Sequence, residues 1–368
     1  MMEDSTSTDR VWAVAEALRC QQCSEPGCIG GCPLGVNVPA ILSLLAEGKI
    51  TKAASVLRTQ CPLASVTGRI CPSSRLCERS CVLNRRGKPI MFRRIELFLG
   101  DLGLGLKIER GRPGRGEILV IGSGSAGLTI ASDLLSEGFS VTVQEREGRA
   151  GGWLRRYPPF RLPADIVDME VARLISSGIN FRLGQEFAPS ATFPPMPFEA
   201  LALAIGAPGC PADGRLYVND VIYQSLKGSP PDCEGYAVEC CSEGAVDLAR
   251  LLMRIRPGAP VILFGKPPEA DLDLAMKEGL ALYLSAPVSE GAGGSRCIIY
   301  DKCDGVAPPF PLEIRPGGFI EVDSRMQTST KRVYAAGSAV GRLSSVTESM
   351  ASGRSLAAGL ILSLILNC

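Results

Sequence analysis

The chain has 368 residues, a net charge of +1 and no histidine, and these facts exclude several classes of protein. A balanced charge argues against a nucleic-acid partner. Without histidine, a Rieske centre, a haem held by histidine and the usual histidine acid–base catalysis are excluded. A chain of this length can form two or three domains, each with its own core.

No part of the sequence predicts export or a membrane span. No charged-then-apolar leader precedes the first cysteine. The longest apolar stretch, Leu356–Leu366, is too short to cross a bilayer and is expected to form a last core helix. Fifteen cysteines without an export signal indicate a reducing compartment, so the expected location is cytoplasmic.

Seven cysteines near the N-terminus form two runs. The runs are Cys20, Cys23, Cys28 and Cys32, then Cys71, Cys77 and Cys81. Thiolates are soft ligands, and clustered thiolates at such short spacings suit zinc or iron–sulfur clusters. A zinc site is usually a closed set of four cysteines or histidines, and disulfide frameworks belong to short secreted chains. The runs therefore predict iron–sulfur clusters and a protein that transfers electrons.

Residues 1–110 are expected to form short helices joined by cysteine-bearing loops. Val11, Trp12, Ala15 and Leu18 predict one apolar helical face, expected to be buried in the core, with a contact surface for a partner protein as the alternative. Asn37, followed by a proline and several apolar residues, predicts the start of another helix. The glycine- and arginine-rich stretch 110–116 predicts a linker and a domain boundary.

A dinucleotide-binding unit is predicted after the linker. A buried strand over 117–121 leads into a glycine turn and a helix, and a second strand over 140–144 ends at Glu145. Gly122 allows the tight turn, Gly124 lets a pyrophosphate approach the backbone, and Gly127 packs the helix against the strand. The helix N-terminus favours phosphate, and Glu145 can accept hydrogen bonds from an adenosine ribose. These features predict FAD rather than FMN, because FMN lacks the adenosine half.

The order of these parts resembles the small (β) subunit of glutamate synthase and the matching N-terminal part of dihydropyrimidine dehydrogenase. The residues that carry the resemblance are Cys20-x2-Cys23-x4-Cys28-x3-Cys32-Pro33, Gly68–Pro72, Cys77, Cys81, Arg94–Glu96, the glycine turn, Gly151-Gly152, Phe160–Pro163, Ala335–Ser338 and Gly353-Arg354. The resemblance implies an α/β protein with a helical domain of two [4Fe–4S] clusters over 1–112. It also implies an FAD domain over 113–209 and 307–368, interrupted by a shortened NAD(P)-like domain over 210–306.

The resemblance also implies a set of cluster ligands. Cys20, Cys23, Cys28 and Cys81 would hold one cluster. Cys32, Cys71 and Cys77 would hold most of the other. Glu96 is the favoured eighth ligand because relatives place a Glu or Gln there, and Cys61 is the rival. Thr67 stands where many relatives have another cysteine, so that position cannot supply a thiolate.

Further residues would contact the flavin. Gly151 and Gly152 are expected to bring the backbone close to it, and Gly337 to end a second strand beside it. Ser338 replaces an Asp that in relatives bonds the ribityl chain. The helix starting near Val346 and Thr347 would aim N–H groups at the flavin pyrimidine edge. The remaining expected contacts are Ser123, Ser125, Ala126, Arg146, Trp153, Arg161, Ala204 and Gly206.

The middle of the chain departs from the family pattern. Where a second glycine fingerprint for NAD(P)H would stand, the sequence has Cys240, Cys241, Ser242 and Glu243. Their side chains would block a pyrophosphate, and Glu243 would repel it. The next strand ends at Gly265-Lys266, where relatives that read a 2′-phosphate usually have arginines. Binding of NAD(P) is therefore doubtful.

The other cysteines are expected to carry no function. Cys233, Cys240, Cys241, Cys297 and Cys303 have spacings that fit no common metal site, and buried free cysteines are ordinary core residues. Cys210 and Cys368 are not assigned a role either.

The sequence therefore predicts an oxidoreductase subunit that passes electrons between FAD, two [4Fe–4S] clusters and other subunits of a redox complex. One alternative is a reductase subunit whose flavin exchanges hydride with NAD(P)H, and another is a non-catalytic scaffold. No side chain is assigned as a catalytic acid or base, and neither nucleic acid nor a membrane span is expected.

Overall fold

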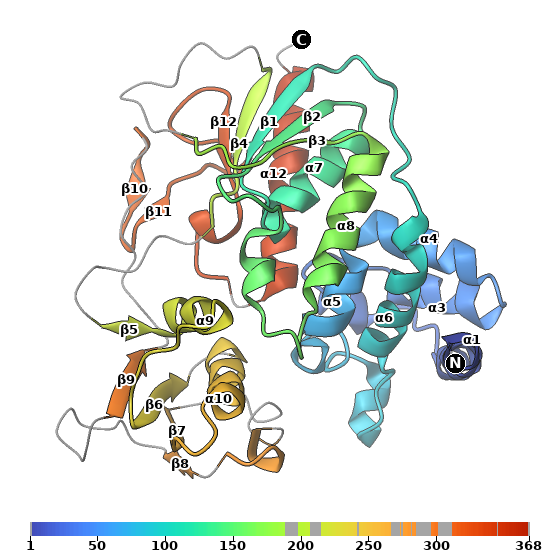
Figure 1. Cartoon of the computed structure of the whole chain (residues 1–368). Helices are drawn as coiled ribbons and strands as arrows, with labels where there is room; N and C mark the ends of the chain where they lie inside the picture. The colour runs from blue at the N-terminus through green and yellow to red at the C-terminus, as the bar shows by residue number, and fades with distance from the viewer. Residues whose placement is uncertain are drawn as a thin grey trace.

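The computed structural model describes residues 2–187, 198–206, 215–240, 243–265, 273, 275–280, 282–284, 296–300, 311–343 and 345–366. In this part of the chain, a helical region precedes two separate parallel sheets (Figure 1). The predicted fold class, a helical domain followed by Rossmann-like α/β structure, is confirmed. Expected features at Cys210, Cys241, Ser242, Lys266, Cys303 and Cys368 lie outside the described residues.

The helical region is built from short helices that pack around leucine, isoleucine and alanine side chains. These are α1 (Met2–Leu18), α2 (Gly27–Gly30), α3 (Val38–Ala46), α4 (Ile50–Gln60), α5 (Ala64–Ile70) and α6 (Phe92–Leu102), with 3₁₀ turns η1 (Ser73–Arg75), η2 (Val82–Arg86) and η3 (Gly103–Gly105). The predicted start of α3 is confirmed, because the Asn37 side chain accepts a hydrogen bond from the Ala40 N–H at 3.1 Å. Ile41, Leu42 and Leu45 of α3 are fully buried.

The predicted buried face of α1 is wrong. Val11 is 71% exposed and Leu18 is 67% exposed, whereas Ala13, Glu16 and Ala17 are buried. Small alanines allow α1 to approach its neighbours closely. Glu16 is buried because its carboxylate accepts hydrogen bonds from Arg19 at 2.6 Å and from the backbone N–H that precedes α6 at 2.9 Å. A polar contact thus fixes the helix rotation that hydrophobic spacing alone predicts incorrectly.

The first sheet has the strand order β12-β4-β1-β2-β3, and the pairings along it are parallel. The strands are β1 (Glu117–Ile121), β2 (Ser140–Gln144), β3 (Asn180–Arg182), β4 (Ala200–Leu203) and β12 (Val333–Ala335). Along β1, Ile118 and Val120 face a core shared with the helices, while Leu119 and Ile121 face the other side. Both faces are therefore covered, as parallel sheets require.

Helices from distant parts of the chain cover one face of this sheet. They are α7 (Ser125–Ser136), α8 (Ala164–Ser177) and α12 (Val346–Leu366), and their buried side chains join the helical region in one continuous core (Figure 1). The expected last core helix is the second half of α12, with Leu356 and Leu360 fully buried. The opposite face packs against the β10 (Ile314–Arg315) and β11 (Phe319–Ile320) hairpin. No helix of the described residues has the length and hydrophobicity of a membrane span.

The second sheet has its own core and the order β5-β9-β6-β7-β8. Its strands are β5 (Leu216–Tyr217), β6 (Gly235–Cys240), β7 (Val261–Gly265), β8 (Leu282–Leu284) and β9 (Arg296–Tyr300). Two helices, α9 (Val218–Leu226) and α10 (Glu243–Ile255), pack on it. The degenerate turn lies between Cys240, which ends β6, and Glu243, which begins α10.

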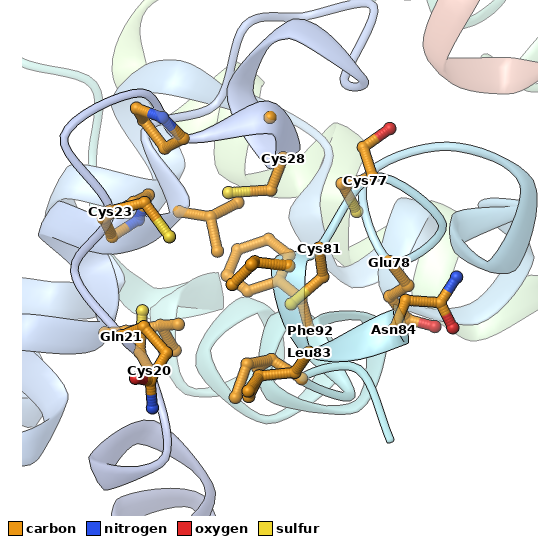
Figure 2. Close-up of a pocket in the computed structure, with 18 of the residues that line it drawn as sticks. Cys20, Gln21, Cys23, Cys28, Cys77, Glu78, Cys81, Leu83, Asn84 and Phe92 are labelled. Carbon is orange, nitrogen blue, oxygen red and sulfur yellow. The ribbon is translucent and has the colours of Figure 1, made fainter. Parts of the chain in front are cut away.

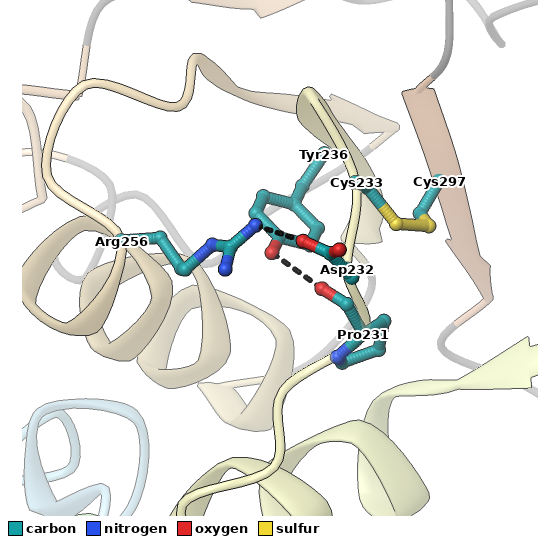
Figure 3. The surroundings of a disulfide bond; sticks show 6 residues. All are labelled: Pro231, Asp232, Cys233, Tyr236, Arg256 and Cys297. Atoms are coloured by element: carbon teal, nitrogen blue, oxygen red, sulfur yellow. Dashed lines mark hydrogen bonds and ion pairs between the residues drawn. A yellow bond between two sulfur atoms is a disulfide. The ribbon is translucent and has the colours of Figure 1, made fainter.

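The expectation that Cys233 and Cys297 are free core cysteines is wrong, because the structure joins them in a disulfide (Figure 3). The reason is strand pairing: β6 and β9 are parallel neighbours, and Cys297 lies opposite Tyr236 in the register. The two Cα atoms are 5.9 Å apart, a normal disulfide separation. Beside the bond, the Tyr236 hydroxyl donates to the Pro231 carbonyl at 2.7 Å.

Candidate iron–sulfur and flavin sites

Four predicted ligands of one set line one cavity, and Cys77 of the other set also lines it. Cys20 and Cys23 follow α1, Cys28 lies in α2, and Cys81 precedes η2, yet all four line a cavity of about 560 Å³ (Figure 2). Burial and the neighbouring thiols of Cys20 and Cys81 raise the pKa of Cys28 to about 11. Bound iron is positively charged and would therefore stabilise the thiolate forms of these cysteines. The donor set and the space fit the predicted group.

The other predicted ligands form a second group beneath the first. Cys71 and Cys77 are buried, and Glu96 on α6 is only 6% exposed. Burial, followed by the charge of Glu96, raises the pKa values of both thiols. The charge of Cys32 contributes to both shifts, so these four side chains are near neighbours. The structure therefore places the members of each predicted set near one another, with Cys77 bordering both groups.

Both candidates for the eighth ligand lie beside the second group. The Thr67 hydroxyl donates to the Glu96 carboxylate at 2.7 Å and is 3.2 Å from the Cys61 sulfur. Burial raises the pKa of Glu96 to about 7, against the lowering effect of the hydrogen bonds from Thr67 and Cys61. A buried carboxylate without a cation is costly. Ligation of iron would offset that cost at Glu96.

Among the described residues, no group of three or more cysteine, aspartate or glutamate side chains could hold a single metal ion.

The glycine turn forms the cradle that a pyrophosphate requires. Gly122 follows β1 with a φ of +97°, a conformation that favours glycine. A Cβ on Gly127 would collide with the Gly122 carbonyl oxygen, which shows how closely α7 approaches the strand end. A Cβ on Gly124 would meet no protein atom within 4 Å. The space above Gly124 is open, so a ligand can reach the backbone there.

Glu145 follows β2 and lies beside the same glycine turn, as predicted. One oxygen of its carboxylate accepts hydrogen bonds from the backbone N–H and hydroxyl of Ser123, at 2.9 and 2.6 Å. The other oxygen accepts from the Glu147 N–H at 3.0 Å. The Ser123 hydroxyl also accepts from the Gly151 N–H at 2.9 Å. One small network thus joins the turn, the end of β2 and the predicted Gly151-Gly152 contact.

The N-termini of α7 and α12 meet at this site. The Ser125 hydroxyl donates to the Ser349 hydroxyl at 3.0 Å, and Gly353 packs closely on Ala126. Gly337 approaches from β12, and its N–H donates to the Ser352 hydroxyl at 2.9 Å. Both helix N-termini would favour the negative charge of a phosphate or a reduced flavin.

Several of the remaining predicted flavin contacts lie near the glycine turn or at the ends of β4, β12 and α12. Ala204 is buried directly beside Gly122, and Val346 and Thr347 are buried at the start of α12. Ser338 follows Gly337 in a 3₁₀ turn, and Gly206 is exposed two residues after Ala204.

Three predicted contacts have other partners in the structure. Arg161 forms an ion pair at 3.2 Å with the buried Asp247 of α10, which ties it to the second sheet. Trp153 is 41% exposed and lies 4.9 Å from the Arg156 guanidinium. Arg146 is exposed beside Glu147.

Two residues that hold the site together were not predicted from the sequence. Ser349 and Ser352 of α12 bond to Ser125 and Gly337. Their three-residue spacing on one helix face is the only signal that the sequence offers for them.

The two regions are also in contact beside the second ligand group. The sulfur of Cys71 lies 3.9 Å from the hydroxyl oxygen of Thr347, in the first turn of α12. Cys71 ends α5 in the helical region, whereas Thr347 lies 276 residues later. The second ligand group is therefore in contact with the helix end that is predicted to face the flavin.

Family models match both regions. Residues 2–106 match dihydropyrimidine dehydrogenase domain II, 4Fe-4S cluster, and residues 120–181 match an NAD(P)-binding Rossmann-like domain. The predicted resemblance is confirmed. The helical region is thus similar to a 4Fe-4S cluster domain, and most of the glycine turn's unit lies in the segment that is similar to a dinucleotide-binding domain.

Curated relatives include subunits of redox enzymes. The NAD-dependent dihydropyrimidine dehydrogenase subunit PreT of Salmonella typhimurium is 32% identical over 200 residues, covering 53% of this chain and 48% of that protein. The small chain of glutamate synthase [NADPH] of Mycobacterium tuberculosis is 35% identical over 199 residues, covering 52% and 40% respectively. The chain spans about half or less of the length of these relatives.

A solved structure shares the fold. The thioredoxin reductase of Lactococcus lactis has a TM-score of 0.50 at 16% sequence identity, covering 68% of this chain and 99% of that one. This likeness concerns the architecture of the two sheets alone.

Proposed function

We propose that this chain is an electron-transfer subunit that binds FAD and two [4Fe–4S] clusters and exchanges electrons with a partner protein. The observation that carries the proposal is the 3.9 Å contact between Cys71 and Thr347. It supports a continuous route from the flavin site to the second ligand group. The curated relatives, which are subunits by name, support a protein partner.

Each part of the chain has a defined role in this proposal. FAD would supply two-electron chemistry, and the clusters would supply one-electron transfer. The glycine turn and Glu145 would hold the adenosine and pyrophosphate half. The α12 N-terminus, at Val346 and Thr347, would stabilise negative charge at the flavin ring. Cys20, Cys23, Cys28 and Cys81 would bind one cluster, and Cys32, Cys71, Cys77 and Glu96 would bind the other.

Light-driven reduction of the bound flavin tests this proposal. The purified anaerobic chain would be illuminated with EDTA as electron donor, and the clusters followed by electron paramagnetic resonance. We expect reduced [4Fe–4S] signals to appear after the flavin absorbance falls. The matched control is a flavin-free Gly124→Val variant under the same light, in which cluster reduction should be much slower.

Two results would contradict the proposal. The flavin could be reduced while both clusters stay oxidised, which would indicate a scaffold. The purified protein could also contain zinc in place of iron, which would remove the electron route altogether.

A further inference from the structure

The first ligand group is more exposed than the second. Cys20, Cys23, Cys28 and Cys81 are all partly exposed, whereas in the second group Cys71, Cys77 and Glu96 are buried and only Cys32 is partly exposed. Because Cys71 contacts the flavin-side helix, the partly exposed group is the far end of the route. The cavity that it lines, shown in Figure 2, is where an electron would leave or enter the molecule.

The chain segment that forms one side of this cavity is basic. Residues 75–94 contain seven basic side chains and one acidic side chain, a net charge of +6, although the whole chain carries only +1. Arg79 and Arg85 line the cavity, and Arg86 and Lys88 follow in the same segment. All four are exposed, and within the described part of the chain none of them forms an ion pair. These charges therefore face solvent and not a partner within the chain.

Acidic groups near the cavity are few. Glu25 is exposed on its edge. Glu78 also lines it, and its carboxylate accepts a hydrogen bond from the Arg93 N–H at 3.0 Å. These two acids balance Arg79 and Arg85 in the cavity lining, and Arg94 pairs with Asp9 at 3.4 Å, so the excess positive charge lies beside the cavity, at exposed side chains such as Arg86 and Lys88.

Exposed apolar side chains lie among these charges. Leu18 is 67% exposed two residues before Cys20, and Val82 is 43% exposed next to Cys81. Met91 is also 43% exposed, and its N–H donates to Glu16 at 2.9 Å, which places it beside the end of α1. An apolar centre with a charged rim is the usual composition of a protein interface.

We propose that this surface, the basic docking face, binds a redox protein whose own cofactor is surrounded by acidic residues. The inference rests on the proposed electron-transfer function and specifies its partner. The basic rim would steer and orient the acidic protein, and the apolar residues beside Cys20 and Cys81 would allow close approach. In each transfer one electron leaves the reduced chain and enters the oxidised centre of the partner, with no bond made or broken.

Two haem proteins of opposite charge can serve as probes. The soluble domain of cytochrome b5 has an acidic haem edge, and cytochrome c has a basic one. The dithionite-reduced chain, freed of excess reductant, would be mixed with each oxidised cytochrome in a stopped-flow instrument. The second-order rate constant of haem reduction would be measured at increasing salt concentration.

We expect the rate with cytochrome b5 to fall about tenfold as salt rises from low to physiological ionic strength, and the rate with cytochrome c to rise or stay constant. The variant Arg85→Glu with Arg86→Glu should slow cytochrome b5 reduction about tenfold at low salt and accelerate cytochrome c reduction. A second variant, Arg79→Glu with Lys88→Glu, tests the same face if the first loses iron or flavin.

The matched control changes the same charge elsewhere. Lys107→Glu with Arg112→Glu alters two exposed side chains of the linker before β1, and it should leave both rates within about twofold of the unmodified chain. Equal effects of the control and the docking-face variants would contradict the docking face and leave electron transfer intact. Failure to reduce either cytochrome at any salt concentration would instead contradict the proposed function itself.

Discussion

Two buried carboxylates, Glu96 and Glu145, are each held by a hydroxyl group from a neighbouring segment. Thr67 donates to Glu96 and Ser123 donates to Glu145. Hydrogen bonds to a buried carboxylate offset part of its desolvation. At Glu145 three donors are present, whereas Glu96 keeps a raised pKa of about 7. The carboxylate of Glu145 thus has enough hydrogen-bond donors without a metal, whereas the carboxylate of Glu96 would gain stabilisation from a bound iron.

Gly124→Val should remove FAD while leaving the fold and the iron in place. A Cβ at Gly124 meets no protein atom within 4 Å, and the backbone φ of −68° is open to any residue. The added side chain would therefore obstruct only the approach of the pyrophosphate. Flavin absorbance, iron content and circular dichroism would be measured together. The control Gly105→Val, also in open space, should retain flavin; FAD bound normally by Gly124→Val would refute the site.

Glu96→Ala should cost about half of the iron, because it removes one ligand from one of two clusters. Cys61→Ala, a matched change on the other side of Thr67, should leave the iron content and both cluster signals unaltered. Iron analysis and electron paramagnetic resonance distinguish the two variants. Loss of iron from Cys61→Ala, with Glu96→Ala intact, would assign the eighth ligand to Cys61.

At the scale of elements, a buried charge cluster joins the helical region to the first sheet domain. Arg58 of α4 donates two hydrogen bonds to Glu170 of α8, at 2.6 and 2.7 Å, and Arg173 lies 3.4 Å from the same carboxylate. Their side chains are 4%, 1% and 3% exposed, respectively. A second contact joins Arg354 of α12 to the Gln60 carbonyl at 2.6 Å. These anchors fix α4 and α5 against α8 and α12, and so hold Cys71 against Thr347.

Glu170→Gln should destabilise the chain by about 3–5 kcal/mol, because it leaves two buried guanidinium groups without a counter-charge. Urea denaturation followed by circular dichroism would measure the change. Asp232→Asn is the control: it breaks the pair that Asp232, 92% exposed, forms with Arg256, and should leave the urea midpoint almost unchanged. Similar costs for the two variants would show that burial does not govern the anchor.

At the scale of the whole molecule, the sites form a sequence from the interior to the surface. The proposed flavin site lies between two helix ends, Cys71 of the proposed buried ligand group contacts one of them, and the partly exposed group lies at the proposed basic docking face. The second sheet domain is not part of this series of sites and has its own core. The ion pair between Arg161 and Asp247 joins it to the first sheet domain. Its position is compatible with a structural role.

Neither NADH nor NADPH in excess should bleach the flavin of the isolated chain, whereas dithionite should. The physical reason is the turn between β6 and α10, where Cys240 and Glu243 stand at the strand and helix ends in place of glycine and a neutral residue. A charged side chain there repels a pyrophosphate. Absorbance at the flavin maximum under anaerobic conditions provides the measurement. Rapid bleaching by either nucleotide would favour the alternative of an NAD(P)H-dependent reductase.

The sequence alone determined the local patterns that depend on neighbouring residues. The strand, glycine turn and helix from 117 to 136 follow from burial and backbone freedom, and the start of α3 follows from a cap at Asn37. The division of the cysteines into two ligand sets was inferred through resemblance and stays a prediction, although the structure places four of one set, with Cys77, around one cavity. Each of these depends on identity and spacing along the chain.

Only the tertiary structure decided the features that join distant segments. The rotation of α1 follows from the bond between Glu16 and the start of α6, and the disulfide between Cys233 and Cys297 follows from the pairing of β6 with β9. The contact of Cys71 with Thr347 spans 276 positions. No local pattern encodes such distances, because they arise from the packing of whole elements around a shared core.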